Sequence, residues 1–114
     1  RHLSHFALRS DPEVVELVLH GVPPVIRSKV WLALSGADDV RGRHSVDYYA
    51  KLITLASKHG TAFDDDINKD VSRTLAGLEL FQSEAGLSAL TRVLRAFCLR
   101  NYSVGYCQGM NLLA

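Results

Sequence analysis

The sequence predicts an all-α protein, and three observations support this fold class. Apolar residues recur at helical spacing in several segments, whereas no segment alternates as a half-buried strand does. Glycine, proline and asparagine residues separate these segments at intervals that suit helices of ordinary length. The chain has 114 residues, of which 47% are hydrophobic, so it can build a core and forms one domain or part of one.

The first expected helix covers residues 12–20. Asp11 is suited to the N-cap and Pro12 to the first helical position. Gly21 follows the helix at the position where a left-handed residue is favoured.

The second expected helix begins at the proline pair 23–24 and ends at Gly36. Its apolar stripe consists of Ile26, Val30 and Leu34. On the neighbouring face we expect Trp31 to be a core anchor, as a tryptophan on the apolar side of a helix usually is. Arg27, one turn earlier, is expected to stack on Trp31 or to pair with a carboxylate. We interpret both residues as structural.

Residues 37–44 are polar and contain a glycine, so we expect a loop there. An amphipathic helix then follows from about Ser45 to Gly60. Its apolar residues are Tyr49, Leu52, Ile53 and Ala56. The acidic residues 64–66 are expected to cap or face the N-terminus of a helix that begins near Ile67. Gly77 is expected to interrupt or end that helix.

The longest expected helix follows residues 83–86 and ends at Asn101. Its apolar stripe is expected to comprise Leu87, Leu90, Leu94 and Phe97, with Cys98 adjacent. A turn is expected at residues 103–105, and Gln108 onwards indicates the start of another helix.

Composition excludes several classes of protein. A formal net charge of +1 argues against nucleic acid as the main partner. The sequence has no run of 18 apolar residues, so no transmembrane helix is expected. The N-terminal residues lack the apolar region of a signal peptide. Cys98 and Cys107 have no metal-binding spacing, which favours free thiols in a reducing, cytosolic setting. Because the chain stops inside a helix-like stretch, we expect it to be one partial domain over residues 1–114.

Asp70 and Arg73 form the first candidate site. Three residues apart on a helix, they are neighbours on its surface, and the simplest interpretation is an ion pair that contributes under about 1 kcal/mol. The functional interpretation is that Asp70 fixes the guanidinium of Arg73 in one orientation. A planar, permanently charged fork suits a phosphate ligand.

The second candidate site is the segment from Tyr106 to Gln108, which lies between Gly105 and Gly109. It is either a helix-entry turn with a packed tyrosine or a site where the glycines let a partner's backbone approach the Gln108 amide. An arginine and a glutamine held near one another are two groups that GTP hydrolysis by a small GTPase needs. No glycine-rich phosphate loop occurs in the sequence, so such residues would act in trans on another protein.

Two further interpretations remain open on the residues alone. Cys107 could be a nucleophile with a histidine as its base, although no spacing links it to any of the 5 histidines. The chain could also be a purely structural piece of an α-solenoid, which would require an internal repeat that the sequence does not show.

Taken together, the motifs resemble the TBC domain of Rab GTPase-activating proteins, over nearly the whole chain but only the N-terminal part of that domain. The matching residues are Gly21-Val22-Pro23, Arg27, Trp31, Ile67, Asp70, Arg73, Thr74 and the run Gly105-Tyr106-Cys107-Gln108-Gly109-Met110-Asn111. One departure is that residues 75–77 are Leu-Ala-Gly, where family members commonly have a proline soon after the Arg-Thr pair.

The resemblance implies an all-α fold and a mechanism with two catalytic residues. Arg73 would be the arginine finger, and Gln108 would replace the GTPase's own glutamine in orienting water. Asp70 would hold Arg73, and Tyr106 would help to position the glutamine loop. The framework residues would be Arg27, Trp31 and Ile67.

The partner implied by the resemblance is a Rab-family small GTPase in the cytoplasm, at endomembranes through that partner. GTP and Mg²⁺ would belong to the GTPase, so this chain is expected to hold no metal or cofactor. The alternative is a catalytically inactive TBC-like module that only binds a small GTPase.

Overall fold

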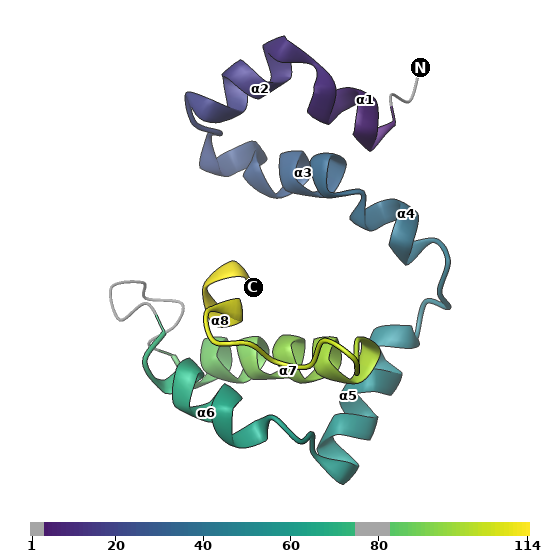
Figure 1. The fold of residues 1–114 in the computed structure, drawn as a ribbon, viewed down its shortest axis with the longest axis vertical. Helices are drawn as coiled ribbons and strands as arrows, with labels where there is room; N and C mark the ends of the chain where they lie inside the picture. Colours follow the sequence, from purple (N-terminus) through teal and green to yellow (C-terminus); the bar gives the residue numbers. More distant parts are fainter. Residues whose placement is uncertain (1–3, 75–82) are drawn as a thin grey trace. The chain divides into compact units, whose positions relative to one another are not determined.

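The computed structural model describes residues 4–74 and 83–114, and all regular structure in these ranges is helical (Figure 1). The all-α prediction is therefore confirmed for this part of the chain. The helices are α1 (His5–Ser10), α2 (Pro12–Leu19), α3 (Pro24–Ser35), α4 (Ala37–Arg41), α5 (Tyr48–His59), α6 (Asp64–Ser72), α7 (Glu84–Arg100) and α8 (Met110–Leu113). None of these described helices is both long and apolar enough to cross a membrane.

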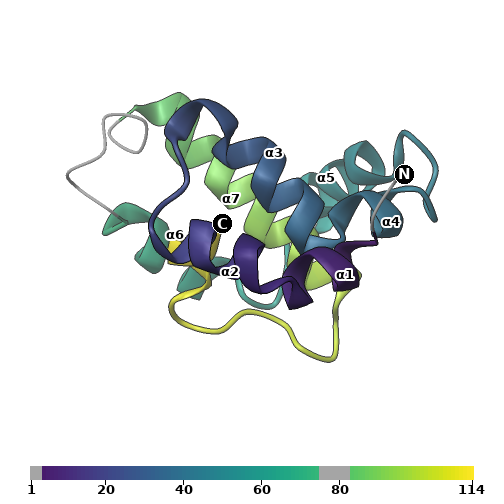
Figure 2. The same ribbon diagram turned by 90° about the horizontal axis from the view of Figure 1, so that it is seen from above.

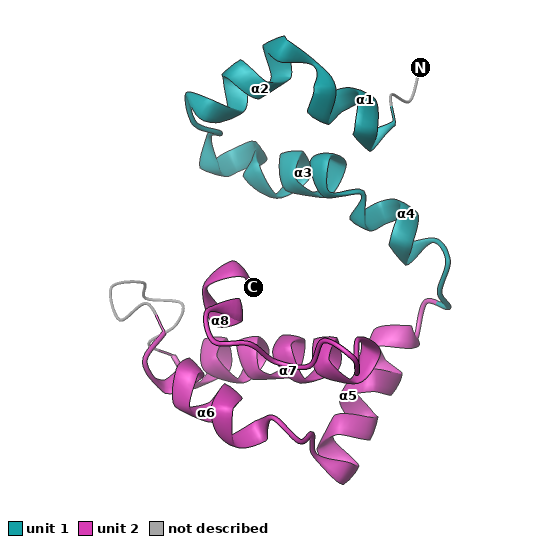
Figure 3. Ribbon diagram, viewed as in Figure 1, with its two compact units in different colours: residues 1–45 teal, residues 46–114 magenta. Residues whose placement is uncertain are grey.

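The chain divides into two compact units, residues 1–45 and residues 46–114 (Figure 3). The expectation of a single partial domain stays a prediction. The expected effect of Gly77 and the departure at residues 75–77 both lie outside the described residues.

In the first unit, α1 packs against α2 and α3, and α3 also contacts α4. Asp11 caps α2 as expected, because its carboxylate accepts hydrogen bonds from the backbone N–H groups of Glu13 and Val14. Gly21 follows α2 with a φ of 106°, which confirms its expected left-handed conformation. The His5 imidazole lies 2.9 Å from an Asp39 carboxylate oxygen and thereby links α1 to α4.

Two helices of the first unit differ from expectation. Residues 37–41 form α4, where we expected a loop. Gly36 adopts a left-handed conformation that ends α3 and lets the chain turn directly into another helix. Acidic residues in the first turn of α4 and Arg41 in its last suit the helix dipole. Helix α1 was not expected, since six residues are too few to show a helical period.

Trp31 is not a buried core anchor, because 48% of its surface is exposed. Among the described residues of the first unit, α3 contacts only the short helices α1 and α4, and none of its own residues is buried. Among the described residues, Arg27 stacks on no aromatic ring and pairs with no carboxylate, contrary to expectation. Its Nε and Nη2 atoms donate to the carbonyl oxygen of Val22, at 3.2 and 2.9 Å, and so hold the turn that precedes α3.

In the second unit, α7 packs against α5, α6 and α8. The central core consists of Ile67, Val71, Leu90, Leu94 and Cys98. Spacing of four residues on both α6 and α7 places these side chains on the facing sides of the two helices. Phe97 lies off this face and is 38% exposed, so the apolar stripe of α7 continues through Cys98 and not through Phe97.

Helix α6 begins at Asp64, three residues before the expected start. The Thr61 hydroxyl donates to the Asp64 carboxylate at 2.6 Å, and Arg95 of α7 donates to the same carboxylate at 2.8 Å. The acidic residues 64–66 are thus the first helical turn itself, where negative charge is favourable. After α7, which Asn101 ends as expected, the chain turns back to α8, which packs against α6 and α7 (Figures 1 and 2).

Candidate functional site

Arg73 lies immediately after α6, at the C-cap position. The helix is fixed at this end because Val71 and Ile67 are buried against α7. One turn earlier, Asp70 accepts hydrogen bonds at Oδ1 from Arg73 Nε, at 3.0 Å, and from Arg73 Nη2. The Asp70 side chain is 6% exposed and that of Arg73 is 62% exposed. A buried carboxylate thus orients a guanidinium that faces solvent.

The Asp70 carboxylate also accepts a hydrogen bond from the segment that precedes α8. The Tyr106 hydroxyl donates to Asp70 Oδ2 at 2.7 Å. This hydrogen bond, together with those from Arg73, lowers the pKa of the Asp70 carboxyl below its ordinary value. Burial, together with the hydrogen bond to Asp70, raises the pKa of Tyr106 to about 12. At neutral pH the pair is therefore a carboxylate that accepts a hydrogen bond from a neutral phenol.

Gln108 lies in a turn that glycines shape on both sides. Gly105 and Gly109 have φ angles of 65° and 99°, a backbone region that residues other than glycine rarely adopt. Gly105 is buried, and a methyl group at this position would collide with the ring of Phe63. This contact packs the returning chain against the residue that precedes α6. On the other side of Gln108, Met110 packs against the hydrophobic core.

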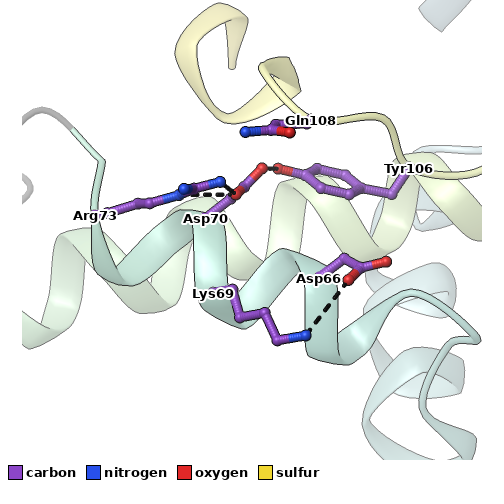
Figure 4. A pocket seen from close by; sticks show the side chains of 6 residues that line it. All are labelled: Asp66, Lys69, Asp70, Arg73, Tyr106 and Gln108. Carbon is purple, nitrogen blue, oxygen red and sulfur yellow. Dashed lines mark hydrogen bonds and ion pairs between the residues drawn. The ribbon is translucent and has the colours of Figure 1, made fainter.

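Arg73 and Gln108 face the same open depression, which has a volume of about 460 Å³ (Figure 4). The other residues that line it are Asp66, Lys69, Asp70 and Tyr106. Within the described residues, the Gln108 side chain has no hydrogen-bond partner, so its amide is available to a ligand. The structure therefore brings the four residues Asp70, Arg73, Tyr106 and Gln108 together, as the sequence motifs indicate.

Sequence reasoning gave four other residues of this region no part in the candidate site. Lys69 and Asp66 line the depression and form an exposed ion pair, with 3.8 Å between Lys69 Nζ and Asp66 Oδ1. Thr74 and Asn111 are buried beside Asp70 and hydrogen-bond to each other at 2.7 Å. The sequence signal that could have identified Thr74 and Asn111 was their position next to the candidate residues. Thr74 directly follows Arg73, and Asn111 follows Gln108 by three residues.

The predicted framework residues lie in different places. Ile67 is completely buried in the core beside Asp70, whereas Arg27 and Trp31 belong to the first unit. Across the ranges described, no three or more histidine, cysteine or acidic side chains gather as a metal site would require.

The alternative of a cysteine nucleophile gains no support from the geometry. Cys98 is buried, and burial together with the nearby Asp64 carboxylate raises the pKa of its thiol. Cys107 is exposed, and among the described residues no histidine hydrogen-bonds to it. An activated nucleophile needs a base within hydrogen-bond reach.

Comparison with known proteins decides the family. The profile of the Rab-GTPase-TBC domain family matches residues 24–114. The chain belongs to this family. The resemblance inferred from the sequence motifs is thereby confirmed.

Two curated relatives come from Schizosaccharomyces pombe. The GTPase-activating protein gyp2 is 33% identical over 110 residues, which cover 96% of this chain and 15% of that protein. TBC domain-containing protein C4G8.04 is 38% identical over 99 residues, which cover 86% of this chain and 12% of that protein. This TBC chain therefore spans less than a sixth of the length of each relative.

A solved structure also matches this TBC chain. The crystal structure of the Chlamydomonas flagellar RabGAP TBC domain has a TM-score of 0.79 and 31% sequence identity. The match covers 91% of this chain and 36% of that one.

Proposed function

We propose that this TBC chain supplies Arg73 and Gln108 in trans to a Rab-family small GTPase and so accelerates the hydrolysis of its bound GTP. The observation that carries the proposal is that the two side chains face one open depression while a buried carboxylate orients the arginine (Figure 4). Membership of the Rab-GTPase-TBC domain family supports the same function.

The geometry of Arg73 suits an arginine finger. Asp70 accepts from Nε and from Nη2, so the Nη1 group remains available to a ligand in the part of the chain that the structure describes. Because the salt bridge fixes the guanidinium before any partner arrives, less side-chain entropy is lost on binding. The charge would then stabilise the negative charge on the transferring phosphoryl group, an effect of roughly 10³–10⁵ in rate.

Gln108 is suited to orienting the attacking water. A side-chain amide offers both a donor and an acceptor, and the exposed Gln108 amide lies on the rim that also contains Arg73. Tyr106, two residues earlier, hydrogen-bonds to the carboxylate that holds Arg73. The water-orienting and charge-stabilising groups are therefore both positioned relative to Asp70.

In this proposal the nucleotide and its Mg²⁺ belong to the GTPase. The sequence contains no glycine-rich phosphate loop, and the depression is an open surface that a partner protein can enter. A cytoplasmic location, at endomembranes through the Rab partner, is part of the same proposal.

The test is a screen of the complete TBC domain that contains this chain against a panel of GTP-loaded Rab proteins. Binding and single-turnover GTP hydrolysis are measured for each Rab. We expect at least one Rab whose hydrolysis rate rises by a factor of about 10³ or more at saturating domain. Binding without any rise in hydrolysis would favour the alternative of a catalytically inactive binding module.

A further inference from the structure

The buried polar side chains of the described residues form one cluster beside Arg73 and Gln108. They are Asp70 and Thr74, each 4% exposed, and Asn111, which is 7% exposed. Burying a polar group costs free energy unless its hydrogen bonds are made. Their concentration at the depression, and not elsewhere in the described part of the second unit, indicates that the cluster has a positional role there.

Thr74 and Asn111 bind the backbone of the residue that orients Arg73. The Thr74 hydroxyl donates to the Asp70 carbonyl oxygen at 2.7 Å. Asn111 Nδ2 donates to the Thr74 hydroxyl at 2.7 Å and lies 3.4 Å from the same carbonyl oxygen. Thr74 therefore uses its hydroxyl both as a donor and as an acceptor, and it connects α8 to the end of α6.

Gln108 lies between two residues that hydrogen-bond to this cluster. Tyr106, two residues before it, donates to the Asp70 carboxylate at 2.7 Å. Asn111, three residues after it, binds Thr74 and lies against the Asp70 carbonyl. The turn that contains Gln108 is thus attached at both ends to Asp70, once through the side chain and once through the backbone.

We infer that Thr74 and Asn111 are positioning residues that set the spacing between Arg73 and Gln108. This inference rests on the proposed function. The two proposed catalytic side chains come from segments far apart in the sequence, and a misplacement of about 1 Å can reduce a rate on the order of 10²-fold. Both positioning residues are buried, so they do not form the surface that a GTPase contacts. Their loss should reduce the maximal hydrolysis rate and leave GTPase affinity nearly unchanged.

The test uses Thr74→Val in the complete TBC domain, because valine keeps the shape of threonine and removes only the hydroxyl. The matched control is Thr91→Val. Thr91 of α7 also donates to the carbonyl four residues earlier, at 2.9 Å to Leu87, but among the described residues it hydrogen-bonds to neither Asp70 nor Asn111. Single-turnover hydrolysis by a responsive Rab is measured over a range of domain concentrations, and melting is followed by circular dichroism.

We expect Thr74→Val to lower the maximal rate roughly 10- to 100-fold, with the half-saturating concentration changed less than about threefold. Thr74→Ser keeps the hydroxyl and should restore the rate to within about threefold of the parent. Asn111→Leu should match Thr74→Val, and the double variant should lose little more than either one, since both break the same connection. Thr91→Val should leave the rate within about threefold.

A maximal rate for Thr74→Val that is no lower than that of Thr91→Val, after correction for the folded fraction, would overturn the inference. So would an unchanged maximal rate with a raised half-saturating concentration. If Asn111→Leu does not fold, the comparison of Thr74→Val with Thr74→Ser decides. Arg73→Ala in the same assay distinguishes failure of this inference from failure of the proposed function, because an unaffected rate in that variant would contradict the proposed function itself.

Discussion

The two units of the chain differ in where their apolar residues lie (Figure 3). In the described part of the first unit, none of the four helices has a buried residue, and large side chains such as Leu19 and Val25 are 81% and 89% exposed. In the second unit, Ile67, Leu94 and Cys98 are at most 3% exposed and pack in one core.

The second unit also holds the buried polar cluster and the depression with Arg73 and Gln108. The packed core and the proposed catalytic residues thus belong to the same unit, and the core holds the helices that carry the site in place. Equivalent substitutions in the two units should therefore have unequal effects, and the predictions below test this in decreasing order of size.

The largest effect is expected for Arg73 in the second unit. Arg73→Ala, and also Arg73→Lys, should lower GTPase activation in the complete domain by roughly 10³–10⁵, because lysine cannot reproduce the planar fork. The control is Arg27→Ala in the first unit, where the guanidinium, among the described residues, donates to the Val22 carbonyl alone. Single-turnover kinetics should show a less than about tenfold change for Arg27→Ala. Near-normal turnover by the Arg73→Lys variant would refute the assignment of Arg73.

A smaller loss, roughly 10²–10³ in rate, is expected for Gln108→Ala, as for removal of one aligned catalytic hydrogen-bond group. Activation should survive mutation of the GTPase's own switch glutamine, because Gln108 would orient the water. Both variants are measured with the same Rab in a single-turnover assay. Complete resistance of the mutated GTPase would show that Gln108 is not the water-orienting group.

The contrast in burial predicts unequal stability effects for Ile67 and Trp31. Ile67→Ala should destabilise by about 2–5 kcal/mol, since the side chain is completely buried. Trp31→Ala should cost only about 1–2 kcal/mol, because nearly half of its surface already meets water. Urea denaturation followed by circular dichroism measures both. Equal losses would contradict the difference that we draw between the units.

Two glycines provide a matched pair across the units. Gly21 and Gly105 both have a positive φ. A methyl group at Gly105 would lie where the Phe63 ring is, whereas a methyl group at Gly21 would have no atom within 4 Å. Gly21→Ala should cost about 1–2 kcal/mol for the left-handed conformation alone. Gly105→Ala should cost about 1–3 kcal/mol more because of overpacking. Thermal melting of both variants would show this difference, and its absence would mean that the Gly105 turn is free to move away from Phe63.

The smallest effect concerns pH. The pKa of Asp70 is lowered in the folded state, so its stabilising contribution is present above pH 3.8 and is lost as the pH falls further. The pKa of Tyr106 is raised to about 12, so its contribution is present below pH 10 and is lost as the pH rises towards 12. Urea denaturation at a series of pH values should show both losses. Tyr106→Phe should lack the alkaline one, and an identical alkaline loss in that variant would assign it to another group.

Local sequence signals predicted much of the helical structure. Asp11 and Pro12 begin α2, Gly36 ends α3 and Asn101 ends α7, because capping and termination depend on residues next to each other in the chain. The short helices α1 and α4 were missed, since they are too brief to show a period. The predicted burial of Trp31 was wrong, because helical spacing identifies an apolar face without showing whether another element covers it.

The sequence by itself determined the all-α class and the motif residues that the TBC resemblance rests on, including the pairing of Asp70 with Arg73 one helical turn apart. Only the tertiary structure placed Tyr106 on Asp70 and joined Asn111 to Thr74, across 36 and 37 positions of the chain. The physical reason is how far apart the interacting residues lie in the sequence. Caps, turns and same-helix pairs follow from local geometry, whereas a contact between distant segments exists only after α6, α7 and α8 have packed around one core.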